Sequence, residues 1–225
     1  MKMEIFLALI VVFGFLVASC RDAPEPQTIE TEQETASLTI AAVGDSLTAG
    51  YGVAESEAYP ALVETALRAE GMQVQVVNAG VSGETTSGTL ARLDWVLTLA
   101  PDIVILETGA NDGLRGLDPA MVRDNLRQIV DILQGKDIVV VLAGMKMVWN
   151  LGPAYTGEFN RIYPDLAAEK ELIFMPFFLQ GVATDPALNL DDGIHPNPAG
   201  YRIIAGNILP FVREAIAVAG SNATR

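Results

Sequence analysis

Cysteine and histidine each occur once in this chain, and their scarcity removes several kinds of chemistry. A single cysteine cannot form an internal disulfide. Beyond residue 20 the sequence contains one histidine and no cysteine, so a zinc site built from these residues is not expected. Asn189, Asp191 and Asp192 suggest a calcium loop, but their spacing fits no EF-hand. We therefore expect no metal, and no cofactor is needed by the chemistry described below.

Positively charged residues are also scarce. The chain has 14 Lys and Arg against 28 Asp and Glu, which gives a formal net charge of −14. No basic patch offsets this charge, so a polyanion would meet a repulsive field. We therefore expect no nucleic acid as substrate or partner. The same field makes acyl-CoA, which is highly anionic, a less natural substrate than a neutral or zwitterionic ester.

One long apolar run lies near the amino terminus, at residues 5–17 after Lys2. It is shorter than the roughly 20 residues that span a bilayer and has the length of a signal peptide's apolar region. The run ends in LVASC at residues 16–20, which resembles the lipobox of bacterial lipoproteins. That resemblance implies a lipoprotein signal peptide at 1–19 and a lipidated Cys20. Glu4 departs from the usual signal-peptide pattern. The alternative interpretation is that the apolar run is a membrane-anchor helix and that Cys20 is unmodified.

A lipid anchor at Cys20 implies the bacterial cell envelope, with the protein attached to a membrane on the periplasmic side. Arg21 resembles no inner-membrane retention signal, which favours the outer membrane. Residues 20–37 are acidic, contain two prolines and have almost no apolar side chains, which is typical of a flexible tether. Residues 38–225 are enough for one domain with a full core and too few for two.

Five short apolar segments alternate with five amphipathic helices in residues 38–225, which predicts an α/β fold with a parallel sheet covered on both faces. The predicted strands are 38–43, 74–77, 103–106, 138–142 and 172–175. The predicted helices are 60–70, 86–100, 119–134, the region of 155–166, and a last helix that begins at Pro198. Asp118 and Asn197 each precede a proline and are expected to be N-caps, and Pro210 is expected to kink or split the last helix.

Ser46 lies where the first predicted strand ends, in the sequence Gly44-Asp45-Ser46. Ligands of open α/β sheets bind beyond the carboxyl ends of the strands, so this serine is placed to act as a nucleophile. A serine needs a base to take its proton, and the chain's one histidine is His195. Asp192 precedes it by three residues and could hold the imidazole, although Asp191 is also near. Ser46 could instead be a simple helix cap.

Four short blocks resemble those of the GDSL, or SGNH, hydrolase family in sequence and order. They are GDSL at 44–47, NAGVSGETT at 78–86, GAND at 109–112 and DGIH at 192–195. The similarity covers roughly Leu38 to Phe211, within the group of bacterial periplasmic thioesterases, lysophospholipases and arylesterases. It implies a flavodoxin-like three-layer α/β/α sandwich with a five-stranded parallel sheet in the order 2-1-3-4-5. The G-x-S-x-G elbow of the α/β-hydrolase fold is absent.

The resemblance also implies roles for particular residues. Ser46, Asp192 and His195 match the catalytic triad, and the family's D-x-x-H spacing selects Asp192 over Asp191. The backbone N–H of Ser46, that of Gly83 and the side chain of Asn111 match the three donors of the oxyanion hole. A turn glycine and an Asx turn are the structural alternatives for the last two.

An apolar loop at 145–155 follows the fourth predicted strand. Methionine and aromatic side chains in such a loop suit an acyl-binding pocket, and the location resembles the family's acyl-binding region. The expected substrate-binding residues are Met145, Met147, Trp149 and Tyr155. The loop could instead simply cover the end of the sheet.

These observations together favour a monomeric serine hydrolase that cleaves small acyl esters and thioesters through an acyl-Ser46 intermediate. A carbohydrate or peptidoglycan O-acetylesterase on the same scaffold is the nearest alternative. A lipoprotein that binds ligands and has lost activity is the alternative from another class.

Overall fold

The computed structural model describes residues 38–147 and 151–222. The predicted signal peptide, Cys20 and the tether at 20–37 lie outside the described residues, as does Trp149.

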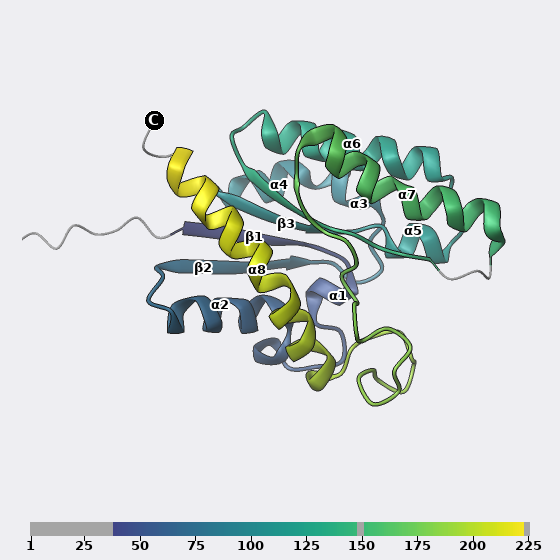
Figure 1. Cartoon of the computed structure of the whole chain (residues 1–225), viewed down its shortest axis with the longest axis horizontal. Coiled ribbons are helices and arrows are strands. Elements are labelled where there is room, and N and C mark those ends of the chain that lie inside the picture. The colour runs from purple at the N-terminus through teal and green to yellow at the C-terminus, as the bar shows by residue number, and fades with distance from the viewer. Residues whose placement is uncertain (1–37, 148–150, 223–225) are drawn as a thin grey trace, which may run out of the picture. The chain divides into compact units, whose positions relative to one another are not determined.

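Five parallel strands form the centre of the domain (Figure 1). They are β1 (Leu38–Gly44), β2 (Val74–Gly80), β3 (Ile103–Glu107), β4 (Val139–Ala143) and β5 (Ile173–Met175). Their order is β2-β1-β3-β4-β5, which confirms the expected flavodoxin-like sheet. All of β3 and most of β1 are buried, because helices cover both faces of the sheet. Gly44 pairs with Gly80 and with Glu107, so β1, β2 and β3 end at the same level.

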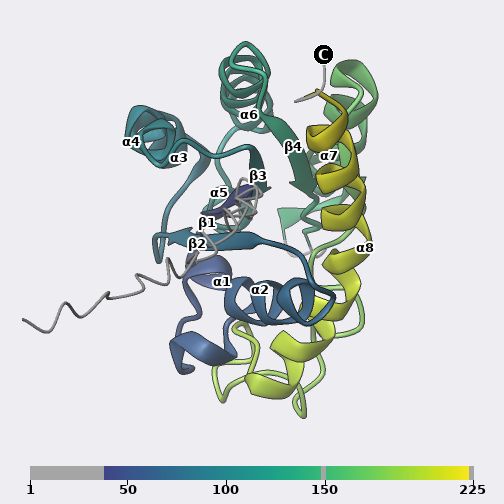
Figure 2. The ribbon, with the colours of Figure 1, turned by 90° about the vertical axis from the view of Figure 1, so that its left-hand side faces the viewer.

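Helices lie on both faces of this sheet, as the view in Figure 2 shows. In chain order they are α1 (Ser46–Ala49), the 3₁₀ helix η1 (Glu55–Glu57), α2 (Tyr59–Ala69), α3 (Thr86–Ala91), α4 (Leu93–Thr98), α5 (Ala110–Leu114), α6 (Pro119–Gln134), α7 (Pro153–Lys170) and α8 (Pro198–Asn222). Helices α2 and α8 pack together on one side of the sheet, while α3, α6 and α7 pack side by side on the other. This is the expected three-layer α/β/α arrangement.

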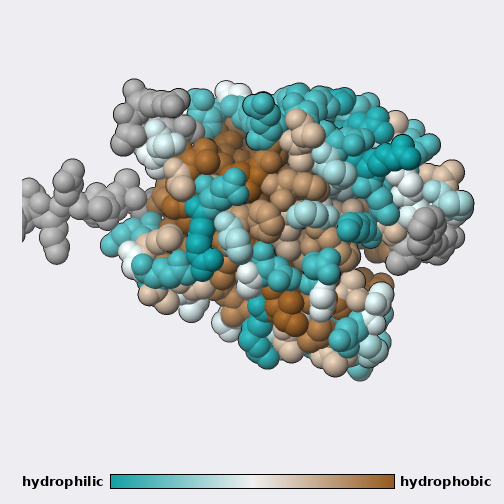
Figure 3. All heavy atoms as spheres, in the orientation of Figure 1, coloured by the Kyte–Doolittle hydropathy of each residue, from teal (hydrophilic) through white to brown (hydrophobic). Residues whose placement is uncertain are grey.

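Helix α6 illustrates how the local sequence sets both ends and one face of a helix. The Asp118 side chain accepts a hydrogen bond from the Ala120 N–H at 2.9 Å, which confirms the predicted N-cap. The apolar stripe from Val122 to Leu133 is fully buried. Charged residues occupy the opposite face, and the outer surface over α6 and α7 is mostly hydrophilic in Figure 3.

One helix prediction was wrong, and two short helices were not predicted. The segment 86–100 forms two helices that break at Arg92, whose guanidinium turns inward to bond Glu84 at 2.6 Å and the Ala79 carbonyl at 2.7 Å. The short helices α1 and α5 were not predicted, because four or five residues are too few to show a helical period.

Helix α8 runs through Pro210 without splitting. The proline cannot donate to the Gly206 carbonyl, but both residues are exposed, so water can satisfy that carbonyl. By length and composition alone α8 could cross a membrane. In the fold its buried residues, among them Tyr201, Ile204 and Ile208, lie on the side that packs against α2, β4 and β5.

Candidate active site

Ser46 is the first residue of α1, directly beyond the carboxyl end of β1. Asp45 caps this helix, since its Oδ1 accepts a hydrogen bond from the Leu47 N–H at 2.9 Å. Gly44 has to be glycine at this point, because a Cβ there would overlap the Glu107 carbonyl oxygen and the Thr48 hydroxyl. The chain therefore turns sharply under Ser46 and leaves the serine side chain at the edge of the sheet.

Ser46, His195 and Asp192 form one hydrogen-bonded line. Ser46 Oγ lies 2.8 Å from His195 Nε2, and His195 Nδ1 lies 2.7 Å from Asp192 Oδ2. The other carboxylate oxygen accepts the backbone N–H groups of His195 and Ile194 at 2.9 and 2.8 Å. These backbone bonds, together with the imidazole bond, lower the pKa of Asp192 to about 2. An ionised carboxylate only accepts, so Nδ1 carries a proton and Nε2 is left to accept the serine proton.

Tyr51 covers the imidazole of His195, and it was not predicted as a site residue. The ring centroids lie 4.6 Å apart at a tilt of 42°, and Tyr51 is 52% exposed. Gly50 and Gly52 flank it with positive φ angles of 79° and 78°. The Gly-Tyr-Gly pattern directly after the serine block was the available signal, since paired glycines allow a tight double turn.

Gly83 and Asn111 lie on two loops that follow β2 and β3, and two contacts hold these loops together. The buried Asp112 carboxylate accepts hydrogen bonds from the Thr86 N–H at 2.9 Å and the Thr86 hydroxyl at 2.6 Å. Arg115 Nη2 donates to the Gly83 carbonyl at 2.8 Å. Gly83 has a φ of +79°, a conformation that favours glycine. The two loops are thus fixed relative to each other by Asp112 in α5 and by Arg115 directly after it.

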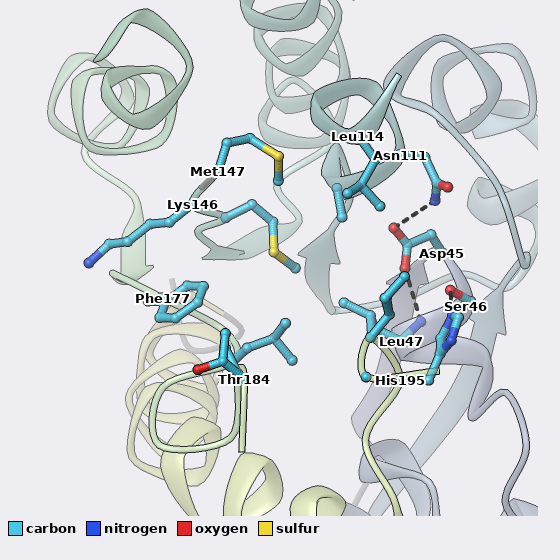
Figure 4. Close-up of a pocket in the computed structure, with 16 residues that line it drawn as sticks. Asp45, Ser46, Leu47, Asn111, Leu114, Lys146, Met147, Phe177, Thr184 and His195 are labelled. Atoms are coloured by element: carbon cyan, nitrogen blue, oxygen red, sulfur yellow. Dashed lines mark hydrogen bonds between the residues drawn. The ribbon is translucent and has the colours of Figure 1, made fainter. Parts of the chain in front are cut away.

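Asn111 points toward Asp45 in the same site (Figure 4). Its Nδ2 donates a hydrogen bond to Asp45 Oδ2 at 3.0 Å. Burial raises the pKa of Asp45 to about 6, although the bonds from Leu47 and Asn111 oppose that rise. A second buried carboxyl group, Glu107, accepts a hydrogen bond from the Thr48 hydroxyl at 2.7 Å. Burial, with the nearby charge of Asp45, raises the pKa of Glu107 well above its ordinary value.

An apolar cavity of about 360 Å³ opens beside Ser46. In Figure 4 the Ser46, His195, Asp45 and Asn111 side chains lie on one side of it, and Met147, Phe177 and Thr184 lie on the other. Its apolar lining comes mainly from Leu47, Leu114, Met145, Met147, Phe177, Leu179, Ala183 and Ile194. The cavity thus has a reactive polar wall and an apolar wall.

Two of the four expected substrate-binding residues, Met145 and Met147, line this cavity. Tyr155 does not. It lies on α7, where its hydroxyl donates to the Leu117 carbonyl at 2.8 Å, so it is a packing residue. Leu114, on α5, and Phe177, on the segment after β5, also line the cavity but were not predicted to bind substrate. Their position just beyond the carboxyl ends of strands was a usable signal.

Among the described residues, no three His, Cys, Asp or Glu side chains gather into a group that could hold a metal ion.

Such a hydrogen-bonded serine, histidine and aspartate, on a parallel sheet and next to an apolar cavity, is the arrangement of a serine hydrolase. Comparison with known proteins agrees. The profile of the GDSL-like Lipase/Acylhydrolase family matches residues 42–203. The chain therefore belongs to this family, and it is an esterase of the SGNH type.

Three relatives illustrate the similarity. An arylesterase of Vibrio mimicus is 40% identical over 171 residues, which covers 76% of this chain and 86% of that protein. Thioesterase 1/protease 1/lysophospholipase L1 of Escherichia coli (strain K12) is 38% identical over 176 residues, or 78% of this chain and 83% of that protein. The crystal structure of AlinE4, an SGNH-hydrolase family esterase, has a TM-score of 0.67 at 44% identity and covers 80% of this chain and 97% of its own.

Proposed function

We propose that this chain hydrolyses acyl esters and thioesters through a covalent acyl group on Ser46. The observation that carries the proposal is the hydrogen-bonded line from Asp192 through His195 to Ser46, which ends at the apolar cavity. Ser46 Oγ attacks the carbonyl carbon while His195 Nε2 takes its proton, and the imidazolium then protonates the leaving alcohol or thiol. Water, activated by the same imidazole, releases the acyl group. The name of the Escherichia coli relative supports including thioesters.

The negative charge on the carbonyl oxygen during this reaction is stabilised by three donors. They are the backbone N–H groups of Ser46 and Gly83 and the side-chain amide of Asn111. The contacts that hold the Gly83 and Asn111 loops together support this role. They fix the relative positions of two donors that follow different strands, β2 and β3.

The acyl group occupies the cavity lined by Met145, Met147, Leu114 and Phe177. Each methylene buried there contributes up to about 0.8 kcal/mol, or nearly fourfold in kcat/KM. The small number of polar groups in the cavity wall favours medium acyl chains over an acetyl group on a sugar.

Labelling tests the nucleophile directly. Wild-type protein should react with a fluorophosphonate at Ser46, as located by mass spectrometry of the peptide, and Ser46→Ala should lose both labelling and ester hydrolysis. The Ser46→Ala protein should keep the wild-type unfolding midpoint, because the side chain lies at the edge of the sheet. Labelling of another serine, or activity retained by Ser46→Ala, would overturn the assignment.

An acyl-length series tests the cavity. Nitrophenyl esters from acetyl to decanoyl should show kcat/KM rising with length and then levelling off. Met147→Ala should flatten the rise and leave acetyl-ester turnover nearly unchanged, whereas the matched variant Met121→Ala, on the exposed side of α6, should leave the series unchanged. A preference for acetyl esters with no change in slope would move the proposal to the sugar O-acetylesterase.

We also propose that residues 1–19 are removed, that Cys20 carries the lipid anchor, and that residues 20–37 tether the domain on the periplasmic side, with the outer membrane favoured. The LVASC sequence at 16–20 supports the anchor. A diacylglycerol plus an N-acyl chain gives stable attachment, unlike a single acyl chain. Cys20→Ser should lose incorporation of labelled palmitate and leave the membrane fraction. A Cys20→Ser protein that still incorporates palmitate would refute the anchor.

A further inference from the structure

The carboxamide of Asn111 can take two orientations about its terminal bond, and they exchange the positions of its oxygen and its NH₂ group. Only the NH₂ group can donate to a developing oxyanion. In the structure Nδ2 donates to Asp45 Oδ2 at 3.0 Å, and within 38–147 and 151–222 this is the only hydrogen bond of that carboxamide. The partner at Asp45 therefore decides which orientation is kept.

Asp45 uses its two carboxylate oxygens for two different donors (Figure 4). Oδ1 accepts the Leu47 N–H at 2.9 Å and Oδ2 accepts Asn111 Nδ2 at 3.0 Å. Asp45 is 1% exposed, so burial limits the access of water to both oxygens. An ionised carboxylate can only accept, and it therefore rejects the orientation in which the Asn111 oxygen faces it.

The backbone under Asn111 is already fixed. Asp112 bonds Thr86 at 2.9 and 2.6 Å, and Arg115 bonds the Gly83 carbonyl at 2.8 Å. What these contacts leave open is the rotation of the Asn111 side chain itself, which neither of them touches.

We propose that Asp45 is a positioning residue that holds the Asn111 carboxamide with its NH₂ group toward the reacting centre. One N–H of that group is engaged by Asp45, and the other stays available for the oxyanion. The proposal rests on the oxyanion role proposed above for Asn111.

The ionisation of Asp45 fits this role. Burial raises its pKa to about 6, so the group is a carboxylate in a mildly alkaline assay. His195, Glu84 and Glu107 are the charged or titratable groups whose fields reach it, and His195 favours the carboxylate while Glu84 disfavours it. Glu107 is disfavoured as an anion by its own burial.

Two substitutions at Asp45 separate the two jobs of its side chain. Asp45→Asn keeps one accepting oxygen, and this oxygen accepts the hydrogen bond from the fixed Leu47 N–H. The new NH₂ group then faces Asn111, whose carboxamide must rotate by half a turn to present its oxygen. Asp45→Ser keeps the cap on α1 but is too short to reach Asn111, which becomes free to rotate. Asp118→Asn is the matched control, because Asp118 is a helix cap that does not line the cavity and has one side-chain bond to the backbone.

The test is a double-mutant cycle with Asn111→Ala, measured with a short-chain nitrophenyl ester above the pKa of Asp45. We expect Asp45→Asn to lower kcat by about 10²- to 10³-fold, as loss of one oxyanion donor does, with a smaller change in KM. Asp45→Ser should lose less, and Asp118→Asn should keep the wild-type kcat. Adding Asn111→Ala to Asp45→Asn should cause almost no further loss, whereas independent roles would multiply the two effects.

Thermal unfolding of each variant separates a positioning effect from misfolding, since the expected kcat losses should appear in protein that is fully folded at the assay temperature. If Asn111→Ala lowers kcat and Asp45→Asn does not, or if the two losses multiply, the positioning role of Asp45 is refuted while the proposed function stands. If Asn111→Ala keeps full kcat, the oxyanion role of Asn111 is refuted, and the positioning role of Asp45 is refuted with it.

Discussion

At the scale of single residues, the least expected feature is a pair of buried acids beneath the serine helix. Asp45 and Glu107 are both almost fully inaccessible, and Oε1 of Glu107 is buried without a hydrogen-bond partner among the described residues. Burial raises the pKa of each group, and the nearby charge of Asp45 raises the pKa of Glu107 further. Both pKa values are therefore higher in the folded protein than in the unfolded chain.

This pair predicts a pH dependence of stability. Because the pKa of Glu107 is raised in the folded protein, the folded protein binds this proton more tightly than the unfolded chain does. The resulting contribution to the free energy of unfolding is fully present below the ordinary pKa of 4.5 and is lost as the pH rises through the folded-state pKa. The new side chain of the Glu107→Gln variant cannot ionise, so the unfolding midpoint of this variant should rise relative to that of the wild type as the pH increases above 4.5. Each kcal/mol of relative stability corresponds to about 2–4 °C in the midpoint.

Thermal unfolding by circular dichroism measures this difference. Glu158→Gln, an exposed substitution on α7, is the control and should follow the wild type at every pH. A Glu107→Gln variant whose midpoint falls further below the wild type as pH rises would contradict the assignment of Glu107 as a destabilising buried acid.

At the scale of elements, the loop that carries Asp192 and His195 depends on the N-cap of α8. Asn197 Oδ1 accepts the N–H groups of Ala199 and Gly200 at 2.9 and 3.1 Å. Its Nδ2 donates to the carbonyls of Ala187 and Asn189 at 2.9 and 3.3 Å. One side chain therefore starts the last helix and also closes the loop before it.

Asn197→Ala should therefore cost more than an ordinary helix cap. A cap alone contributes about 1 kcal/mol, and the two loop carbonyls lose their donor as well. Looser support of the His195 loop should also lower kcat/KM. Urea unfolding and ester hydrolysis measure the two effects.

Asp118→Ala serves as the comparison, because it removes the cap of α6 and touches no loop of the site. It should lose about 1 kcal/mol and keep the wild-type kcat/KM. If Asn197→Ala behaves in the same way as Asp118→Ala, the loop-closing role of Asn197 is wrong.

At the scale of the whole molecule, the formal charge of −14 acts on every charged substrate. A highly anionic thioester such as acyl-CoA approaches against this field, while a neutral ester with the same acyl chain does not. The two substrates share the acyl cavity and differ in the charge of the leaving group.

We therefore predict that salt affects kcat/KM for acyl-CoA and leaves that for the neutral ester nearly unchanged. The kcat/KM for acyl-CoA should rise several-fold between about 0.01 M and about 0.1 M ionic strength, where the Debye length falls from about 30 to about 10 Å. The kcat/KM for the neutral ester should change little over the same range. Steady-state kinetics with matched acyl chains measure this, and an acyl-CoA rate that falls with salt would reveal a local positive field at the site.

The sequence by itself determined the strands and their parallel arrangement, and its resemblance to the GDSL family implied the strand order and the residues of the hydrogen-bonded triad. These properties depend on short-range patterns: apolar runs of strand length, caps beside prolines, and blocks such as GDSL and DGIH that stand out locally. The alternation of strands and helices leaves few arrangements open, because crossovers between parallel strands are right-handed.

Only the tertiary structure decided what depends on contacts between distant segments. It separated Met147, which lines the cavity, from Tyr155, which packs beside α5 and α6, although both lie in or next to the same apolar loop. It also paired Asp45 with Asn111, which is 66 residues away along the chain. Burial, cavity shape and shared hydrogen bonds are properties of the packed fold, and no local pattern of residues encodes them.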